Sequence, residues 1–304
     1  MASTTGPVTI VEVAPRDGLQ NEAVDFTTGQ KLELIARAVR CGARNVEVTG
    51  FVHPGKVPAM ADAEAVAAGL PRDDGVSYSA LVLNMRGLRR AVDAGIGEVN
   101  VVVHCTDAFS LRNQGVDVAD GIGIWHEAAA GARAAGVRAS ATLAVAFGCP
   151  FEGEVPVERV AEIAEAVLAS PPETLSLADT IGVAVPADVR ARFAAVSPLL
   201  PEGVVPRAHF HNTRSTGTAN ALAAVEAGVA ILDSSLGGIG GCPFAPGATG
   251  NVATEDLVYA LDRSGVGTGL SLPELLDAGG WLEGVLGRPL PALVRHAGGF
   301  PVPM

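Results

Sequence analysis

Two histidines separated by a single residue, His209 and His211, end an apolar run and are the clearest candidates for chemistry in this sequence. Side chains alternate between the two faces of a strand, so both imidazoles project the same way while Phe210 packs outward. Such a pair is typical of metal ligands, although two histidines can also simply line a polar surface. Asp17 and Asn251 favour the metal, because two imidazoles, a carboxylate and an amide oxygen form a mixed site suited to Mg²⁺ or Mn²⁺. Zn²⁺ and Co²⁺ remain alternatives.

An arginine, Arg16, stands beside Asp17 directly after another apolar run. An adjacent ion pair on a surface contributes little. An arginine held at the end of a buried strand is better explained as a permanent cation that stabilises an oxygen gaining negative charge. Glu12 and Glu47 lie within apolar strands, where an unpaired carboxylate is unfavourable. We therefore expect each to bond to Arg16 or to orient a ligand, with structural support of the fold as the alternative.

A glycine-rich segment, residues 235–251, holds a single thiol, Cys242. Glycine permits backbone conformations closed to other residues, which suits a mobile lid or an oxygen-binding turn. The segment is not a dinucleotide fingerprint, because Gly238 and Gly240 are followed by Pro243 where a third glycine is needed. A lone cysteine is more often a small buried apolar residue. On a polar loop, however, Cys242 is expected to be accessible.

These residues need a scaffold, and the rest of the sequence predicts one. Eight short runs rich in β-branched residues recur, at residues 8–13, 45–49, 77–82, 98–103, 138–145, 174–177, 205–210 and 230–233. Alanine-rich stretches with helical spacing lie between most of them, such as residues 29–39, 86–94, 157–168, 186–196 and 219–227. Eight alternating units predict an α/β fold, a closed TIM (β/α)8 barrel whose strand ends carry the candidate residues.

The domain organisation follows from the length of 304 residues, which suits one such barrel. Residues 1–270 are expected to form the catalytic barrel, and residues 271–304 to add one or two helices and a tail packed on it. An open doubly wound sheet is the alternative fold. The absence of G-x-G-x-x-G after the first strand argues against it.

The composition excludes several classes of partner. The net charge is −12 and the 21 basic residues are scattered, so neither nucleic acid nor an anionic membrane is expected to bind. No apolar run reaches the roughly 18 residues of a membrane span, and the first residues do not resemble a signal peptide. The four cysteines form no CxxC pair, which argues against a disulfide framework and for a reducing cytoplasm: Cys41, Cys105, Cys149 and Cys242.

Two long motifs resemble one family. Residues 11–22, VEVAPRDGLQNE, resemble the opening signature of hydroxymethylglutaryl-CoA lyases, and residues 237–251 resemble their cysteine-bearing loop. Residues 148–153 and 176–182 match the same family, so the likeness covers nearly the whole chain in one register. The resemblance implies a TIM-barrel metallolyase that assembles as a homodimer or a larger homo-oligomer.

The resemblance also implies roles for individual residues. A divalent metal, Mg²⁺ or Mn²⁺, would be bound by Asp17, His209, His211 and Asn251. Arg16 would polarise the thioester carbonyl and Cys242 would act as acid or base, with a supporting catalytic set of Glu47, Asp179 and His209. The implied substrate is 3-hydroxy-3-methylglutaryl-CoA or a closely related 3-hydroxyacyl-CoA thioester. Its retro-Claisen cleavage yields acetyl-CoA and acetoacetate or the corresponding oxo acid.

Several positions near the expected pocket depart from the family pattern. Arg214 and Ser215 follow the histidine pair where the family more often has a residue such as tyrosine and then glycine, and further changes lie at Ala23, Gly50, His53 and Lys56. Arg214 could pair with an acidic neighbour in the barrel wall or face the pocket as an extra anion receptor. A relative of the hydroxymethylglutaryl thioester is therefore an open alternative for the substrate.

Two other functions compete with the lyase. A condensing enzyme of the isopropylmalate or homocitrate synthase type shares the Arg-Asp opening and the histidine pair. Those enzymes usually carry Gly-Glu-Gln after the aspartate, whereas this chain reads Gly18-Leu19-Gln20, and they lack the Cys242 loop. A catalytically silent barrel that only binds a ligand is disfavoured, because every implied ligand and catalyst is present.

Overall fold

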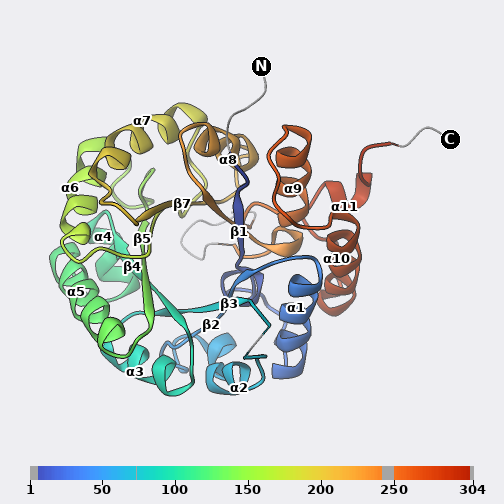
Figure 1. The fold of residues 1–304 in the computed structure, drawn as a ribbon, viewed down its shortest axis with the longest axis horizontal. Helices are drawn as coiled ribbons and strands as arrows, with labels where there is room; N and C mark the ends of the chain where they lie inside the picture. Colours follow the sequence, from blue (N-terminus) through green and yellow to red (C-terminus); the bar gives the residue numbers. More distant parts are fainter. Residues whose placement is uncertain (1–5, 73, 242–249, 302–304) are drawn as a thin grey trace.

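Eight parallel strands close into a barrel in which each strand pairs with the next along the chain and β1 pairs with β8 (Figure 1). The structure is a computed structural model that describes residues 6–72, 74–241 and 250–301. All eight strands lie at the positions that the β-branched runs predict: β1 (Thr9–Glu12), β2 (Asn45–Gly50), β3 (Ser77–Val82), β4 (Glu98–His104), β5 (Arg138–Ala144), β6 (Thr174–Asp179), β7 (Val205–Phe210) and β8 (Ile231–Ser234). The open doubly wound sheet is therefore wrong.

Helices form a ring outside the strands (Figure 1). They are α1 (Thr28–Arg40), α2 (Ala63–Ala68), α3 (Met85–Asp93), α4 (Asp107–Asn113), α5 (Val118–Ala134), α6 (Val157–Leu168), α7 (Pro186–Val196), α8 (Gly217–Glu226), α9 (Thr254–Arg263), α10 (Leu272–Leu286) and α11 (Val294–Ala297). Between the helices and the strands lies the main apolar core, which buries Trp125, Phe193 and Phe210. The burial of whole aromatic and aliphatic side chains stabilises the packing of the helices on the strands.

The interior of the barrel is partly polar. Asn100 of β4 donates to Glu47 of β2 (Nδ2 to Oε2, 3.1 Å) and accepts from the hydroxyl of Thr142 of β5 (3.0 Å). On the opposite wall, Arg207 of β7 donates to Asp233 of β8 (Nε to Oδ1, 2.6 Å). All five side chains are buried. Buried polar groups require such partners, and here the partners come from neighbouring strands.

Residues after α9 add α10 beside α1, and α11 beside α9 and α10 (Figure 1). The backbone N–H of Ser271 donates to the carbonyl of Cys41 at the end of α1 (2.8 Å), and that of Ala292 donates to the carbonyl of Gly237 in the turn after β8 (3.2 Å). Leu275, Leu282 and other apolar residues of α10 join a second buried cluster at this side of the barrel. The C-terminal helices thus cover the region where the first and last strands meet.

No helix within residues 6–72, 74–241 and 250–301 is long and apolar enough to cross a membrane.

Candidate metal centre and active site

A single π-helical turn, η1 (Ala14–Gly18), directly follows β1. The backbone N–H groups of Arg16, Asp17 and Gly18 all point to the carbonyl of Val13, at 3.1, 2.8 and 3.1 Å. This wide turn keeps both charged residues at the carboxyl end of β1 instead of continuing the strand. Such turns are rare and frequently accompany functional sites.

Three predicted metal ligands meet at the mouth of the barrel. One ligand atom from each of Asp17, His209 and His211 lies within 4.8 Å of the others. The two imidazole centroids are 5.2 Å apart, and Phe210 between them is buried in the outer core, as the alternation of strand side chains predicts. Asn251 joins the group, because His211 and Asn251 form an isolated antiparallel bridge and the Nδ2 of Asn251 donates to Oδ2 of Asp17 (2.7 Å).

Unpartnered buried atoms test whether these residues fit a cation. The Nδ2 of Asn251 donates both to Asp17 and to the carbonyl of Ile239 (3.1 Å), which fixes the orientation of the amide. Its Oδ1 is buried and has no hydrogen-bond partner within the described part of the chain. The same holds for Nδ1 of His211. A buried acceptor without a donor is unfavourable, and an oxygen-binding or nitrogen-binding cation would satisfy it. The residues therefore fit a divalent cation.

The charges around the cluster keep its members in their metal-binding forms. Burial acts to raise the pKa of Asp17, but the charges of Arg16, His209 and His211 and the bond from Asn251 outweigh it and lower the pKa to about 2. Burial, followed by the charge of His209, lowers the pKa of His211 to about 4. At neutral pH Asp17 is thus a carboxylate and His211 a neutral imidazole, the forms that metal ions bind.

His209 has a partner that the sequence pattern alone does not indicate. Its Nδ1 lies 3.1 Å from Oδ2 of Asp233, while its Nε2 lies 4.0 Å from Oδ2 of Asp17. Burial acts to lower the pKa of His209, but the hydrogen bond and the charge of Asp233 raise it overall. Asp233 ends an apolar strand and pairs in register with His209. The signal in the sequence is an aspartate at the end of the apolar run 230–233.

Arg16 is held by two carboxylates. Its Nε pairs with Glu47 and its Nη1 with Asp17 (2.8 Å), and its side chain is largely buried. Burial acts to lower the pKa of Arg16, but the charges of Glu47 and Asp17 raise it, so the guanidinium stays charged. The expected pairing of Glu47 with Arg16 is confirmed. One ion pair uses Nε and the other uses Nη1, so neither involves Nη2.

No hydrogen bond joins Glu12 to Arg16, so that part of the expectation is wrong, and the partners of Glu12 fit the structural alternative. Its Oε1 accepts from the backbone N–H of Ala14 (2.8 Å) and of Leu236 (2.9 Å), and its Oε2 accepts from the hydroxyl of Thr254 (2.7 Å). Burial raises its pKa to about 7 although these bonds act to lower it. Side chains alternate along β1, so Glu12 shares the face of Val8 and Ile10, which pack in the outer core, and it joins β1 to the segments after β8.

Asp179 and Arg214 lie around the end of β6. The two carboxylate oxygens of Asp179 accept from the backbone N–H groups of Val183 (2.9 Å) and Ala184 (3.1 Å). Burial raises the pKa of Asp179, although the charges of His209 and Arg214 act to lower it. Arg214 is exposed, and its Nη1 donates to the carbonyls of Ile181 (3.2 Å) and Gly182 (2.8 Å). Its hydrogen-bond partners among the residues described are thus carbonyls of the barrel wall, not a carboxylate.

Cys242 lies outside the described residues, but both ends of its segment reach the metal centre. The carbonyl of Gly241 accepts from Nδ2 of Asn21 (2.9 Å). Gly240 has φ +107°, and a Cβ there would lie 2.5 Å from Nδ2 of Asn251, so only glycine fits. The described chain resumes at Gly250, directly before Asn251. Cys41, Cys105 and Cys149 are free and buried.

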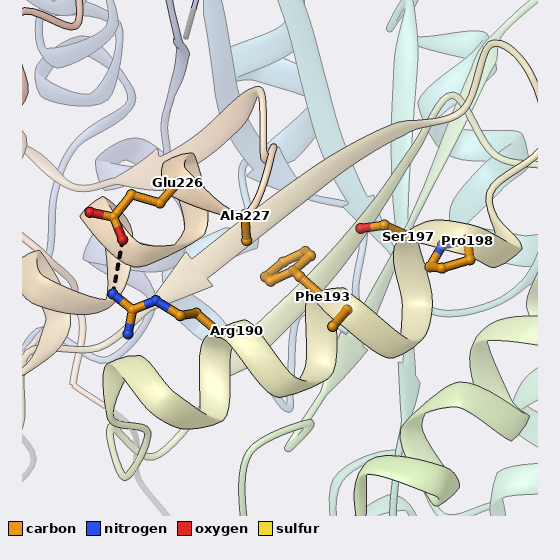
Figure 2. A pocket seen from close by; sticks show the side chains of 7 residues that line it. Arg190, Phe193, Ser197, Pro198, Glu226 and Ala227 are labelled. Carbon is orange, nitrogen blue, oxygen red and sulfur yellow. Dashed lines mark hydrogen bonds and ion pairs between the residues drawn. The ribbon is translucent and has the colours of Figure 1, made fainter. Parts of the chain in front are cut away.

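A hollow on the outside of the barrel is separate from this centre. Figure 2 shows it between α7 and α8, with Phe193 at its floor and an ion pair between Arg190 and Glu226 (2.8 Å) at one side. Both charged side chains are at least half exposed, where ion pairs contribute little. This hollow belongs to the helical layer, and the chemistry lies at the strand ends.

A cluster that fits a divalent cation, placed at the carboxyl ends of the strands of a (β/α)8 barrel, is typical of TIM-barrel enzymes. The family model described as HMGL-like matches residues 7–281. The chain belongs to this family, and it is a carbon–carbon lyase.

Similar proteins span the whole chain. A hydroxymethylglutaryl-CoA lyase of Bacillus subtilis, YngG, is 42% identical over 94% of this chain and 95% of its own length. An (R)-citramalyl-CoA lyase of Chloroflexus aurantiacus is also 42% identical, over 96% and 95%. The solved structure of an HMG-CoA lyase from Acinetobacter baumannii in complex with coenzyme A and 3-methylmalate superposes with a TM-score of 0.92 at 35% identity, and the match covers 100% of both chains.

Proposed function

We propose that this enzyme cleaves 3-hydroxy-3-methylglutaryl-CoA, or a closely related 3-hydroxyacyl-CoA, to acetyl-CoA and an oxo acid. The observation that carries the proposal is the contact between Arg16 and Asp17, which sets a permanent cation beside the carboxylate of the metal cluster (2.8 Å). A retro-Claisen reaction needs both features. One side of the substrate loses a hydroxyl proton while the other, the thioester, accumulates negative charge.

The metal ligands in this proposal are Asp17, His209, His211 and Asn251, with Mg²⁺ or Mn²⁺ as the ion. When bound, such a cation supplies Lewis acidity that lowers the pKa of the substrate's 3-hydroxyl. Carboxylate and amide oxygens beside imidazoles suit these ions.

Arg16 acts on the thioester. Its Nε and Nη1 are held by Glu47 and Asp17, which fixes the guanidinium and leaves Nη2 to bind the forming enolate oxygen. As the C2–C3 bond breaks, its electron pair moves onto the thioester and the C3 hydroxyl becomes a ketone. A cation fixed in advance stabilises this charge without reorganisation during the reaction. Glu47 is thus a positioning residue, held in turn by Asn100.

Protons are moved by two groups in this scheme. Asp179 receives the hydroxyl proton, supported by the pKa that burial raises and by its electrostatic interaction with His209. Cys242 delivers a proton to C2 of the enolate to complete acetyl-CoA, supported by the ends of its segment at Gly241 and Asn251. The glycines that flank it suit a loop that excludes water from the enolate.

A citramalyl thioester is the second candidate substrate, because the two relatives named above are equally similar to this chain. Both substrates carry a 3-hydroxyl and a thioester and differ in the distance of the distal carboxylate from C3. Those two shared features should be required, whereas the length of the acyl chain decides between the substrates.

A substrate panel tests the proposal. Purified protein with Mg²⁺ or Mn²⁺ is given hydroxymethylglutaryl-CoA, citramalyl-CoA or longer 3-hydroxyacyl-CoA thioesters, and acetyl-CoA is measured. We expect acetyl-CoA from at least one 3-hydroxy-3-methyl thioester. A parallel reaction with acetyl-CoA and 2-oxo acids measures released thiol, and thiol release without any cleavage would make the protein a condensing enzyme instead. No turnover in either reaction would favour a silent binding protein.

The assembly is a further part of the proposal. A homodimer or larger homo-oligomer is expected from the family, and light scattering of the purified protein measures it.

A further inference from the structure

The two histidines of the metal centre differ in what lies behind them. Nδ1 of His209 lies 3.1 Å from Oδ2 of Asp233, and Oδ1 of Asp233 accepts from Nε of Arg207 at 2.6 Å. Nδ1 of His211 has no hydrogen-bond partner in the ranges that the structure describes. Of the two, His209 thus has a carboxylate behind its ring, whereas His211 pairs with Asn251 through the backbone.

The Arg207–Asp233 pair that contacts His209 is buried inside the barrel. The side chains of Arg207 and Asp233 are 3% and 5% exposed, so bulk water does not compete for their bonds. Arg207 and His209 share the inward face of β7, and Asp233 faces them from β8 through the pairing of His209 with Asp233. The fixed register of β7 and β8 therefore keeps Arg207, Asp233 and His209 in hydrogen-bond contact.

We propose that the Arg207–Asp233 pair is a positioning device that holds His209 as the tautomer with its proton on Nδ1, and so presents Nε2 to the metal. A carboxylate only accepts, so Nδ1 must be the donor in this contact. The free Nε2 then lies on the side of Asp17, 4.0 Å from its Oδ2. Carboxylates behind metal-bound histidines act in this way in other metal sites.

Arg207 determines which hydrogen-bonding group residue 233 can offer to His209. A guanidinium has donors and no acceptor, so the group between Arg207 and His209 must offer an acceptor to Arg207. Aspartate offers acceptors to both sides. An asparagine would turn its oxygen to Arg207 and its NH₂ to His209. Nδ1 would then have to accept, the proton would move to Nε2, and the nitrogen that faces the metal would be blocked.

The inference rests on the proposed metal centre, but its test does not depend on catalysis. Asp233→Asn is predicted to weaken Mn²⁺ binding, measured by electron paramagnetic resonance or calorimetry, by about 10- to 100-fold. Asp188→Asn makes the same chemical change on the outer helix α7, where Asp188 accepts from the N–H of Val185, and should leave the affinity unchanged. Melting temperatures of all variants are measured in parallel, because a purely structural role would lower them without a selective loss of affinity.

A double variant gives the sharper result. In Arg207→Met with Asp233→Asn, no donor holds the amide oxygen, so the amide can turn it toward His209. This variant should bind Mn²⁺ several-fold more tightly than Asp233→Asn alone. Loss in the single variant with no recovery in the double one would overturn the argument about tautomers.

Nitrogen NMR of the metal-free protein reads the tautomer directly. The chain has 6 histidines, so a ¹⁵N-histidine spectrum at pH 9 is simple, and the His209→Gln variant assigns the signal. We expect Nδ1–H in the wild type and Nε2–H in Asp233→Asn. If Asp233→Asn does not fold, the wild-type spectrum decides alone, and an Nε2–H signal for His209 overturns the proposal. Mn²⁺ binding with the expected tautomer but without cleavage of any thioester would refute the proposed reaction and leave this inference standing.

Discussion

Two sides of the barrel mouth carry similar residue types and differ in their surroundings. On the side of β7, β8 and η1, His209 faces Asp17 and Asp233, and opposite charges converge. On the side of β4 and β5, His104 packs its ring against Phe109 (centroids 5.2 Å). Burial lowers the pKa of His104 to about 4, although a hydrogen bond to Asn113 acts to raise it.

The thiol on this second side is equally enclosed. Cys149 is buried, and its Sγ accepts from the hydroxyl of Thr106 (3.1 Å) and from the backbone N–H of Phe151 (3.5 Å). Both sides lie at strand ends, where barrel enzymes place their chemistry. Position at a strand end is therefore not sufficient. Nδ1 of His104 is also buried and has no partner among the residues described, so what distinguishes the metal side is that opposite charges meet around its unpartnered atoms.

The largest effect should come from the metal side itself. Asp17→Ala removes a carboxylate whose pKa of about 2 keeps it ionised, so both metal occupancy and turnover should fall, turnover to roughly a thousandth of wild type or less. EDTA should abolish activity and Mg²⁺ or Mn²⁺ should restore it. His104→Gln is the matched control from the other side and should keep its metal. Full turnover in excess EDTA, with no metal found by elemental analysis, would show that this side of the barrel mouth does not need a metal ion for catalysis.

Arg16 should separate catalysis from metal binding. Arg16→Gln should reduce turnover by roughly 100-fold or more while metal occupancy stays near that of wild type, because the cation acts on the enolate and not on the metal. Steady-state kinetics and metal analysis of the same preparation measure both. Equal losses in rate and occupancy would mean that Arg16 mainly holds Asp17 in place.

The cysteines should differ in reactivity. Burial raises the pKa of Cys41 and of Cys105 to about 12, so at pH 8 both are protonated thiols and react slowly. Cys242 is predicted to be the thiol whose alkylation inactivates the enzyme, with protection by substrate. Mass spectrometry locates the label. Inactivation that follows labelling of Cys149 would place the sensitive thiol on the other side of the mouth.

The smallest effect is expected for Arg214. Its two bonds to carbonyls of the β6 loop indicate a structural role, so Arg214→Tyr should lower the free energy of unfolding by about 1 kcal/mol and leave the order of substrates unchanged. Denaturant titration and the substrate panel measure the two effects. A changed substrate preference would bring Arg214 into the pocket.

Much of this molecule can be predicted from local patterns. β-Branched runs and helical spacing mark the strands and helices because each side of a strand or helix meets one environment along its length. Gly42, Gly95, Gly136 and Gly228, which end helices in the sequence, all have positive φ, the conformation that favours glycine. Asp17, His209 and His211 could be found because parallel strands bring their ends together.

Other features depend on register between strands, which a single strand does not reveal. Asp233 faces His209 only because β8 pairs with β7 in one particular alignment, and the polar chain from Glu47 to Thr142 crosses three strands. Glu12 was expected to bond to Arg16 or to orient a ligand, but its carboxylate accepts from the backbone of Leu236 and the hydroxyl of Thr254. Side-chain partners across strands are thus the part of the site that the local pattern leaves open.

The seam between β1 and β8 has a consequence for folding. Asp17 and Asn251 are 234 residues apart in the chain, and Glu12 and Thr254 are 242 apart. Contacts of such separation require the loop between them to close first, so they form late. During synthesis the metal centre cannot assemble until nearly the whole chain has emerged. Metal binding should therefore indicate that the barrel has closed. Chains that stop before Asn251 lack one of the proposed ligands.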